Sequence, residues 1–178
     1  MYNNVSRNYP HNAERTKHES AKETIQVCHV ISLAAADADG NRLVNAAPGI
    51  MPHSVWLAQE QPNPDPQNSW LAGTKWFDYI YQVGEQVPMI ETPAGWNYRV
   101  RVHNQGVTPL VLAEEDMLIL SPNVDGQLEK LATPSEATVA DLADLKNVLF
   151  LVDYETDDTV TTWTIPASGS ALVYVRRI

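Results

Sequence analysis

Short segments that alternate apolar and polar residues constrain the fold of this chain more than any other feature. The sharpest example is residues 96–103. Its apolar positions are Trp96, Tyr98, Val100 and Val102. Its polar positions are Asn97, Arg99, Arg101 and His103. Alternation with a period of two is typical of a β-strand that buries one face. We therefore expect the apolar face in the core and the polar face in contact with water.

Comparable segments recur along the chain, with turn signals between them. Further strands are predicted at residues 24–33, 50–57, 76–83, 87–90, 110–112, 117–120, 127–131, 147–154, 159–165 and 171–178. The sequence Pro-Asn-Val-Asp-Gly at 122–126 lies between two apolar runs and predicts a hairpin. Many short strands at this spacing indicate an all-β fold, either a β-sandwich of jelly-roll type or a small β-barrel.

One short helix is predicted after residue 132. Thr133 is a suitable N-cap, Pro134 suits the first helical position, and Glu136 completes a capping box. Apolar residues then follow at helical spacing, and Lys146 suits the C-terminal end of a helix.

Residues 1–24 differ from the rest in composition. Val5 is their only strong aliphatic residue, so this segment cannot bury itself against its own neighbours. It contains 4 basic and 3 acidic residues, whereas the rest contains 8 basic and 19 acidic residues. We predict an extended N-terminal arm at 1–24 and a single β-rich domain at 25–178. The arm is expected to bind a partner, and packing on its own domain is the alternative.

The net charge of -10 excludes several classes of partner. Nucleic-acid grooves and anionic membrane surfaces both require basic residues, so neither is an expected ligand. The sequence contains no signal-peptide core and no apolar run long enough to span a membrane, so we expect synthesis in the cytoplasm. Cys28 is the only cysteine, and its apolar neighbours favour a buried structural thiol over a reactive one.

No catalytic, cofactor or metal motif emerges. The five histidines are His11, His18, His29, His53 and His103. They form no close pair of metal ligands, so surface or structural roles are favoured. Residues 37–40 begin like a calcium loop but lack the distal acidic ligand. The acidic cluster at 153–158 could hold a cation, although a solvated turn is favoured. We predict that the protein is not an enzyme.

Two further features are candidates for contact with a partner. Five tryptophans could form a sugar-stacking platform, although core packing is the commoner use. Residues 61–69 alternate proline with polar residues and predict an extended surface loop. The partner-binding residues predicted in the arm and this loop are Tyr2, Arg7, Tyr9, Arg15, Pro62, Pro64 and Pro66.

The order of features from Tyr79 onward carries a family resemblance. The segments concerned are residues 81–87, 96–102, 115–120, 125–128, 148–152 and 171–176. Their order resembles that of tailed-bacteriophage head decoration, or capsid cement, proteins. The long arm and the Pro-rich loop depart from the compact form of that family.

The resemblance implies a virion structural protein that binds the outer surface of an assembled phage head and bridges capsid subunits. The implied partners are the major capsid protein and further copies of the chain. Two alternatives remain open. One is a carbohydrate-binding β-sandwich of a tail fibre or receptor-binding protein, and the other is a minor head or connector protein.

Overall fold

β-Strands make up the regular structure of the chain. The computed structural model describes residues 16–40, 43–47, 55–59, 78–131, 147–153 and 162–178, which contain fourteen strands and no α-helix. The predicted all-β fold is therefore confirmed. The predicted helix beginning at Thr133 lies outside the described residues. Within the described ranges, no helix is long and apolar enough to cross a membrane.

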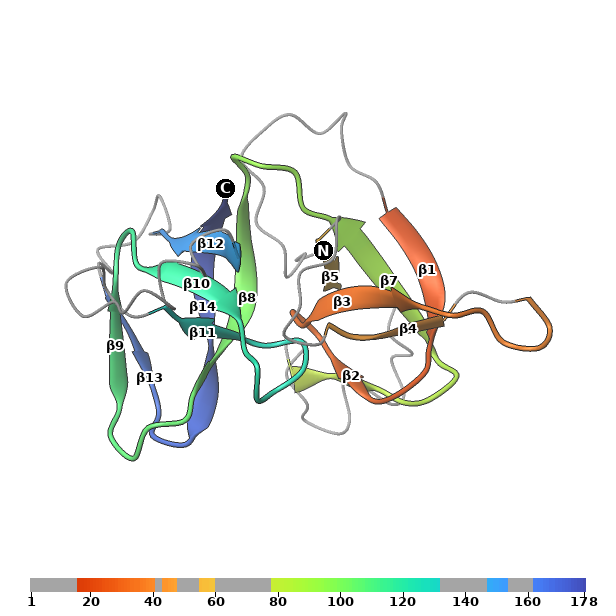
Figure 1. The fold of residues 1–178 in the computed structure, drawn as a ribbon, viewed down its shortest axis with the longest axis horizontal. Helices are drawn as coiled ribbons and strands as arrows, with labels where there is room; N and C mark the ends of the chain where they lie inside the picture. The colour runs from red at the N-terminus through yellow and green to blue at the C-terminus, as the bar shows by residue number, and fades with distance from the viewer. Residues whose placement is uncertain (1–15, 41–42, 48–54, 60–77, 132–146, 154–161) are drawn as a thin grey trace.

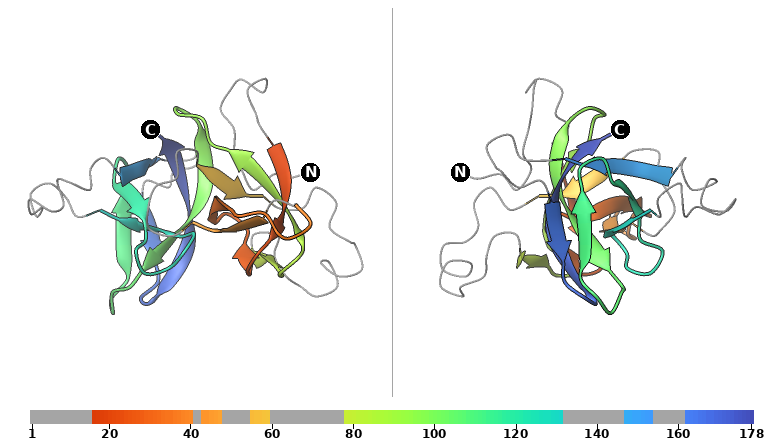
Figure 2. Two further views of the ribbon diagram at one scale, coloured as in Figure 1. Left: turned by 45° about the vertical axis from the view of Figure 1, so that its right-hand side comes forward. Right: turned by 90° about the vertical axis from the view of Figure 1, so that its left-hand side faces the viewer.

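Ten of the described strands close into two five-stranded barrels that lie side by side (Figure 1 and Figure 2). The first barrel contains, in spatial order, β1 (Thr16–Ala21), β4 (Leu43–Ala46), β3 (Val30–Ala34), β5 (Trp56–Ala58) and β7 (Gln86–Glu91). The second contains β10 (Met117–Leu120), β11 (Leu128–Lys130), β8 (Asn97–Asn104), β14 (Gly169–Arg177) and β12 (Val148–Val152).

The odd number of strands forces a parallel pair into each barrel. Around a closed ring of five strands, neighbours cannot all be antiparallel, because the strand directions would not match where the ring closes. In the first barrel β1 runs parallel to β4, with Ser20 opposite Leu43. In the second barrel β11 runs parallel to β8, with Leu128 opposite Val102. The other neighbours in each barrel are antiparallel.

Two two-stranded ribbons accompany the barrels. One pairs β2 (Ile25–Gln26) with β6 (Ile80–Tyr81). The other pairs β9 (Leu110–Ala113) with β13 (Thr162–Ile165), and it lies at the end of the molecule remote from the first barrel (Figure 1). Leu112 and Ile165 of this second ribbon belong to the buried apolar core.

One apolar cluster extends through both barrels. From the first barrel it includes Val30, Leu57 and Ile90, which pack in the same cluster as Val100 and Phe150 of the second. A separate cluster lies within the first barrel and its β2–β6 ribbon, around Ile31, Val44, Met89 and Tyr81. Because burial of apolar surface is the main favourable term in folding, the shared cluster couples the two barrels into one body.

For strand β8, the predicted burial of the apolar face is confirmed, and the predicted exposure of the polar face is wrong in part. Its apolar face, together with the preceding Trp96, is buried as predicted. Asn97 and Arg101, predicted to face water, are only 7% and 6% exposed. Asn97 donates to the Tyr174 hydroxyl of β14, and Arg101 donates to the carbonyl of Val27, in the turn before β3 of the first barrel. Asn97 and Arg101 of the second face are therefore buried by packing against other elements, which the alternation within one strand cannot predict, whereas Arg99 and His103 are half-buried.

Other predicted strands agree with the structure to different degrees. The hairpin around residues 122–126 is confirmed, because β10 and β11 pair antiparallel. Residues 24–33 form two strands instead of one, since the chain turns at Cys28, whose φ is +68°. Strand β4 had no counterpart among the predicted strands.

The predicted arm requires a correction at its C-terminal end. Residues 16–21 form β1, which pairs with five residues of β7, from Gln86 to Ile90. Residues 1–15 lie outside the described part of the chain. Composition did not predict β1 because backbone hydrogen bonds to two neighbours hold it, and a strand held in this way needs few apolar side chains of its own.

This correction predicts different outcomes for two N-terminal deletions. Removing residues 1–15 leaves all described strands in place and should change the thermal unfolding midpoint by less than about 2 °C. Removing residues 1–21 deletes β1, opens the first barrel and leaves the ladder of β7 unpaired, so it should abolish cooperative unfolding of that barrel. Calorimetry with near-ultraviolet circular dichroism checks both. Equal stability of the two shortened chains would contradict the role of β1.

Candidate functional site

The residues predicted to bind a partner all lie outside the described part of the chain. Four of them precede residue 16, and three fall within 60–77; they are Tyr2, Arg7, Tyr9, Arg15, Pro62, Pro64 and Pro66. Their role therefore stays a prediction. What the structure does describe is the junction between the barrels and the exposed face of the β9–β13 ribbon.

Arg101 connects the two barrels from the outward face of β8. Its Nε donates to the carbonyl oxygen of Val27 at 3.1 Å, and one terminal nitrogen lies 3.0 Å from a carboxylate oxygen of Asp78. The backbone N–H of Arg101 also donates to the carbonyl of Cys28 at 3.4 Å. The Arg101 side chain is 7% exposed and that of Asp78 53%, so the pair lies where the junction meets solvent. A guanidinium with donors in a fixed plane permits few alternative positions of these acceptors.

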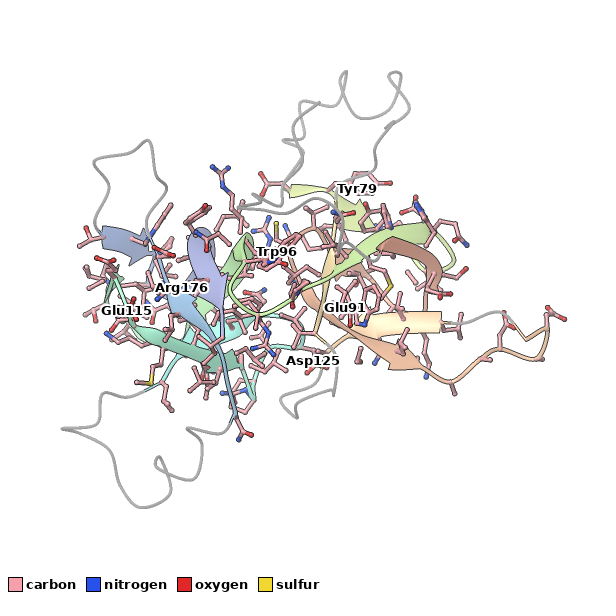
Figure 3. All side chains as sticks on the ribbon, turned by 90° about the horizontal axis from the view of Figure 1, so that it is seen from above. Tyr79, Glu91, Trp96, Glu115, Asp125 and Arg176 are labelled. Carbon is pink, nitrogen blue, oxygen red and sulfur yellow. The ribbon has the colours of Figure 1, made fainter. Side chains whose placement is uncertain are left out.

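Gly126, in the turn between β10 and β11, closes the junction from a second side. Its N–H donates to the carbonyl of Ala47 at 2.8 Å, and its carbonyl accepts from the N–H of Val30 at 2.7 Å. A Cβ here would lie 2.9 Å from Ala46 Cβ and 2.9 Å from His29 Nδ1. The φ of +77° is a further reason for glycine. Asp125, the preceding residue, lies where the barrels meet (Figure 3).

His29 is buried inside this junction without a hydrogen bond from either ring nitrogen to any described group. Its pKa is lowered to about 4, first because burial disfavours the charged imidazolium and second because the Arg101 guanidinium is nearby. The histidine is therefore neutral near pH 7. The sequence favoured a surface or structural role for the histidines, and His29 has the structural one.

Cys28 is the buried structural thiol that its apolar neighbours predicted, with 1% of its surface exposed. The other described histidines differ from His29 in exposure, since His18 is exposed and His103 is half-buried. Within the described ranges, no group of three or more His, Cys, Asp or Glu side chains could hold a metal ion. Of the predicted acidic cluster at 153–158, only Asp153 is described.

Acidic side chains at the end of β9 are partly neutralised by basic partners from the second barrel. Glu115 lies 2.6 Å from a guanidinium nitrogen of Arg176, and both side chains are visible at this end of the molecule (Figure 3). Asp116 lies 2.8 Å from the ammonium of Lys130. These contacts join β9 and β10 to β14 and β11, so they have a structural role at the surface.

The described tryptophans support core packing over a sugar-binding platform. Trp56 and Trp96 are 5% and 7% exposed. Trp163 is half-buried, packs against the shared cluster and donates its indole N–H to the carbonyl of Asp153 at 3.2 Å. Trp70 and Trp76 lie outside the described residues. A sugar-stacking surface needs exposed indole faces, which the three described side chains do not offer together.

The β9–β13 ribbon presents an uncharged outer face. Its inner face carries Leu110, Leu112, Trp163 and Ile165. Its outer face carries the exposed residues Val111, Ala113, Thr162 and Thr164. Val111 is 56% exposed, and Val107 in the preceding turn is 90% exposed. An uncharged face of small and β-branched residues, on a chain of net charge -10, is a candidate surface for contact with another protein.

The edge of β9 opposite β13, which pairs with no other described strand, is poorly suited to pairing with a partner's strand. The N–H of Ala113 donates to a carboxylate oxygen of Asp116, and its carbonyl accepts from the Asp116 N–H. Because backbone groups alternate along a strand, the N–H and carbonyl of Val111 point toward the same edge as those of Ala113. Pro109, two residues before Val111, has no N–H to donate there. The edge therefore offers little for open-ended sheet growth, and contacts at this end would use side chains of the outer face.

Comparison with known proteins shows what this fold is similar to. No family model matches the chain, and no curated protein matches it. Among solved structures, the head fiber gp8.5 N base in bacteriophage phi29 is similar, with a TM-score of 0.50 and 12% sequence identity. The similarity covers 93% of this chain and 94% of that chain. The two proteins therefore share an overall fold along nearly their whole lengths.

The close approach at Gly126 predicts a cost for adding one methyl group. Gly126→Ala should lower the free energy of unfolding by about 2 to 4 kcal/mol, through the positive φ and the contacts with Ala46 and His29. Gly84→Ala is the matched control, because Gly84 has a φ of +86° and no atom near the added Cβ. It should cost only about 1 kcal/mol. Urea unfolding of both variants measures the difference, and equal costs would contradict a tight junction.

The buried position of Arg101 predicts a second contrast. Arg101→Met leaves the Val27 carbonyl without its donor and should cost about 2 to 3 kcal/mol of unfolding free energy. Arg176→Met removes a comparable guanidinium–carboxylate contact at the surface, where the two side chains are 40% and 58% exposed. It should cost less than about 1 kcal/mol. Chemical denaturation compares the two, and a cost for Arg101→Met no greater than the surface value would contradict its role in the junction.

Proposed function

We propose that this chain is a structural protein of a tailed-phage head and binds the outside of the assembled shell. The observation that carries the proposal is the fold, which is similar over 93% of the chain to the N base of a phage head fiber. The order of features along the sequence, which resembles that of head decoration proteins, supports the same location in the particle.

The finer proposal is a cement role, in which the protein bridges neighbouring capsid subunits. A protein of this kind adds contacts that exist only in the assembled shell, so its binding stabilises the assembly by mass action. The proposed partners are the major capsid protein and further copies of the chain. It would act by binding, without catalysis and without a cofactor.

The charge of the chain supports an outward location. The net charge of -10 is that of a surface facing solvent, whereas a protein lining the packaged genome would need basic residues to neutralise phosphate. The described ion pairs of the second barrel balance only part of this charge. Glu114, which precedes the paired Glu115, is exposed and has no ion pair among the described residues.

Two regions are proposed to make the contacts. The first is the N-terminal segment, now limited to residues 1–15, together with the Pro-rich loop at 61–69. A polar segment that orders on a partner can cover a wide surface from a small body. The second is the outer face of the β9–β13 ribbon, where Val111 supplies exposed apolar surface on an uncharged background.

The proposed function predicts saturable binding to phage heads. The test uses heads of the phage that encodes the chain, assembled without it. At saturation, the number of purified copies that these heads bind should be proportional to the number of major capsid protein copies. Deleting residues 1–15 should weaken this binding at least about tenfold, because the segment's contacts are lost while the barrels persist. Cosedimentation with quantified gels measures both the affinity and the occupancy.

Matched variants separate the two proposed contact regions. Val111→Lys places a charge on the outer face of the ribbon, at a side chain that is 56% exposed. Val83→Lys places one at a side chain that is 68% exposed, in the turn between β6 and β7. Binding should fall for Val111→Lys and stay unchanged for Val83→Lys. Failure of the full chain to bind heads would overturn the function. Saturation at only a few copies per head would favour a minor head protein over cement.

A further inference from the structure

Backbone hydrogen bonds join the turn between β10 and β11 to the first barrel. The turn contributes Gly126, whose two backbone hydrogen bonds reach Val30 and Ala47. Gly126 lies close to the His29 side chain, since a Cβ added to this glycine would lie 2.9 Å from His29 Nδ1. The turn therefore covers an imidazole that belongs to the other barrel.

The backbone of His29 cannot easily move away from this turn. Its N–H donates to the carbonyl of Gln26 at 3.1 Å, and its carbonyl accepts from the N–H of Ala58 at 2.9 Å. Cys28 before it is held at a φ of +68°, a conformation that non-glycine residues adopt at some cost. A change in the charge of the imidazole must therefore be accommodated by movement of the β10–β11 turn that packs against it.

Among the described residues, no charged group around His29 is placed to accept a hydrogen bond from an imidazolium. Arg101 on β8 is cationic, and its carboxylate partner Asp78 is already engaged. Glu23 accepts a hydrogen bond from the N–H of Ala46 on β4. Asp125, next to Gly126, is exposed. Neither Glu23 nor Asp125 forms a hydrogen bond with His29, both of whose ring nitrogens lack described partners.

We propose that this contact is an acid-sensitive latch: protonation of His29 releases the β10–β11 turn from the first barrel while both barrels stay folded. The imidazolium would carry two buried N–H groups without acceptors beside a like charge, and displacement of the turn admits water to both. Release breaks the two Gly126 hydrogen bonds, whereas β8 and β14 remain joined by eight residue pairs. This inference is independent of the proposed function.

The direction of the pH dependence follows from the lowered pKa of His29. A group that binds protons less well in the closed state stabilises that state above its ordinary pKa of 6.5 and loses this contribution as the pH falls toward 4. Between pH 7.5 and 5.0 the opening equilibrium should shift by about 30-fold toward release.

Amide hydrogen exchange measured by NMR tests the latch at the bonds that it breaks. Protection factors, corrected for intrinsic exchange, should fall about 30-fold at pH 5.0 for the N–H groups of Val30 and Gly126. Amides of the β8–β14 ladder should keep their protection. His29→Gln removes the titration and should abolish the fall at Val30 and Gly126.

Three outcomes would overturn the latch. They are unchanged protection at Val30 and Gly126, an equal fall in His29→Gln, and an equal fall across the β8–β14 ladder, which would mean global unfolding. The native chain also provides a test that needs no variant. Over a pH series from 6 to 4.5, protection at the two amides should fall with a slope approaching one proton per opening event, and a slope near zero would also overturn the latch.

Discussion

The structure depends on strand β8, which has a buried apolar face and carries the buried Asn97 and Arg101 on its other face. Strand β8 fills the second barrel with its apolar side chains, and from its other face Arg101 reaches the carbonyl of Val27, in the turn that leads into β3 of the first barrel. A strand with buried side chains on both faces cannot slide or rotate without exposing some of them. The position of the first barrel on the second is therefore set by the same strand that forms the second barrel's core.

The junction combines a nonspecific attraction with specific polar contacts. The shared apolar cluster supplies most of the attraction, because it is proportional to the area removed from water and has no preferred direction. Arg101 and Gly126 supply direction, since each bonds backbone groups at fixed positions. We interpret the buried guanidinium as a determinant of orientation, a role that an apolar side chain of equal volume would fill less well.

The sequence predicts the local structure of this chain better than its tertiary contacts. Alternation at 96–103 correctly identified the core face of β8, and the turn residues at 122–126 identified the β10–β11 hairpin. Nothing local distinguishes Arg101, which is buried, from Arg99, which is half-buried on the same face. The same limit applies to β1 and to His29, whose environments are formed by residues distant in sequence.

A rigid junction matters for a protein proposed to act by bridging. Two contact regions on one body bind cooperatively only if their separation matches the spacing of the sites on the shell. A hinge between the barrels would spread that separation over many values, and each bound state would then require the ordering of the hinge. A fixed junction removes this cost before binding. Under the proposed function, the contacts of Arg101 and Gly126 therefore contribute to affinity without touching the partner.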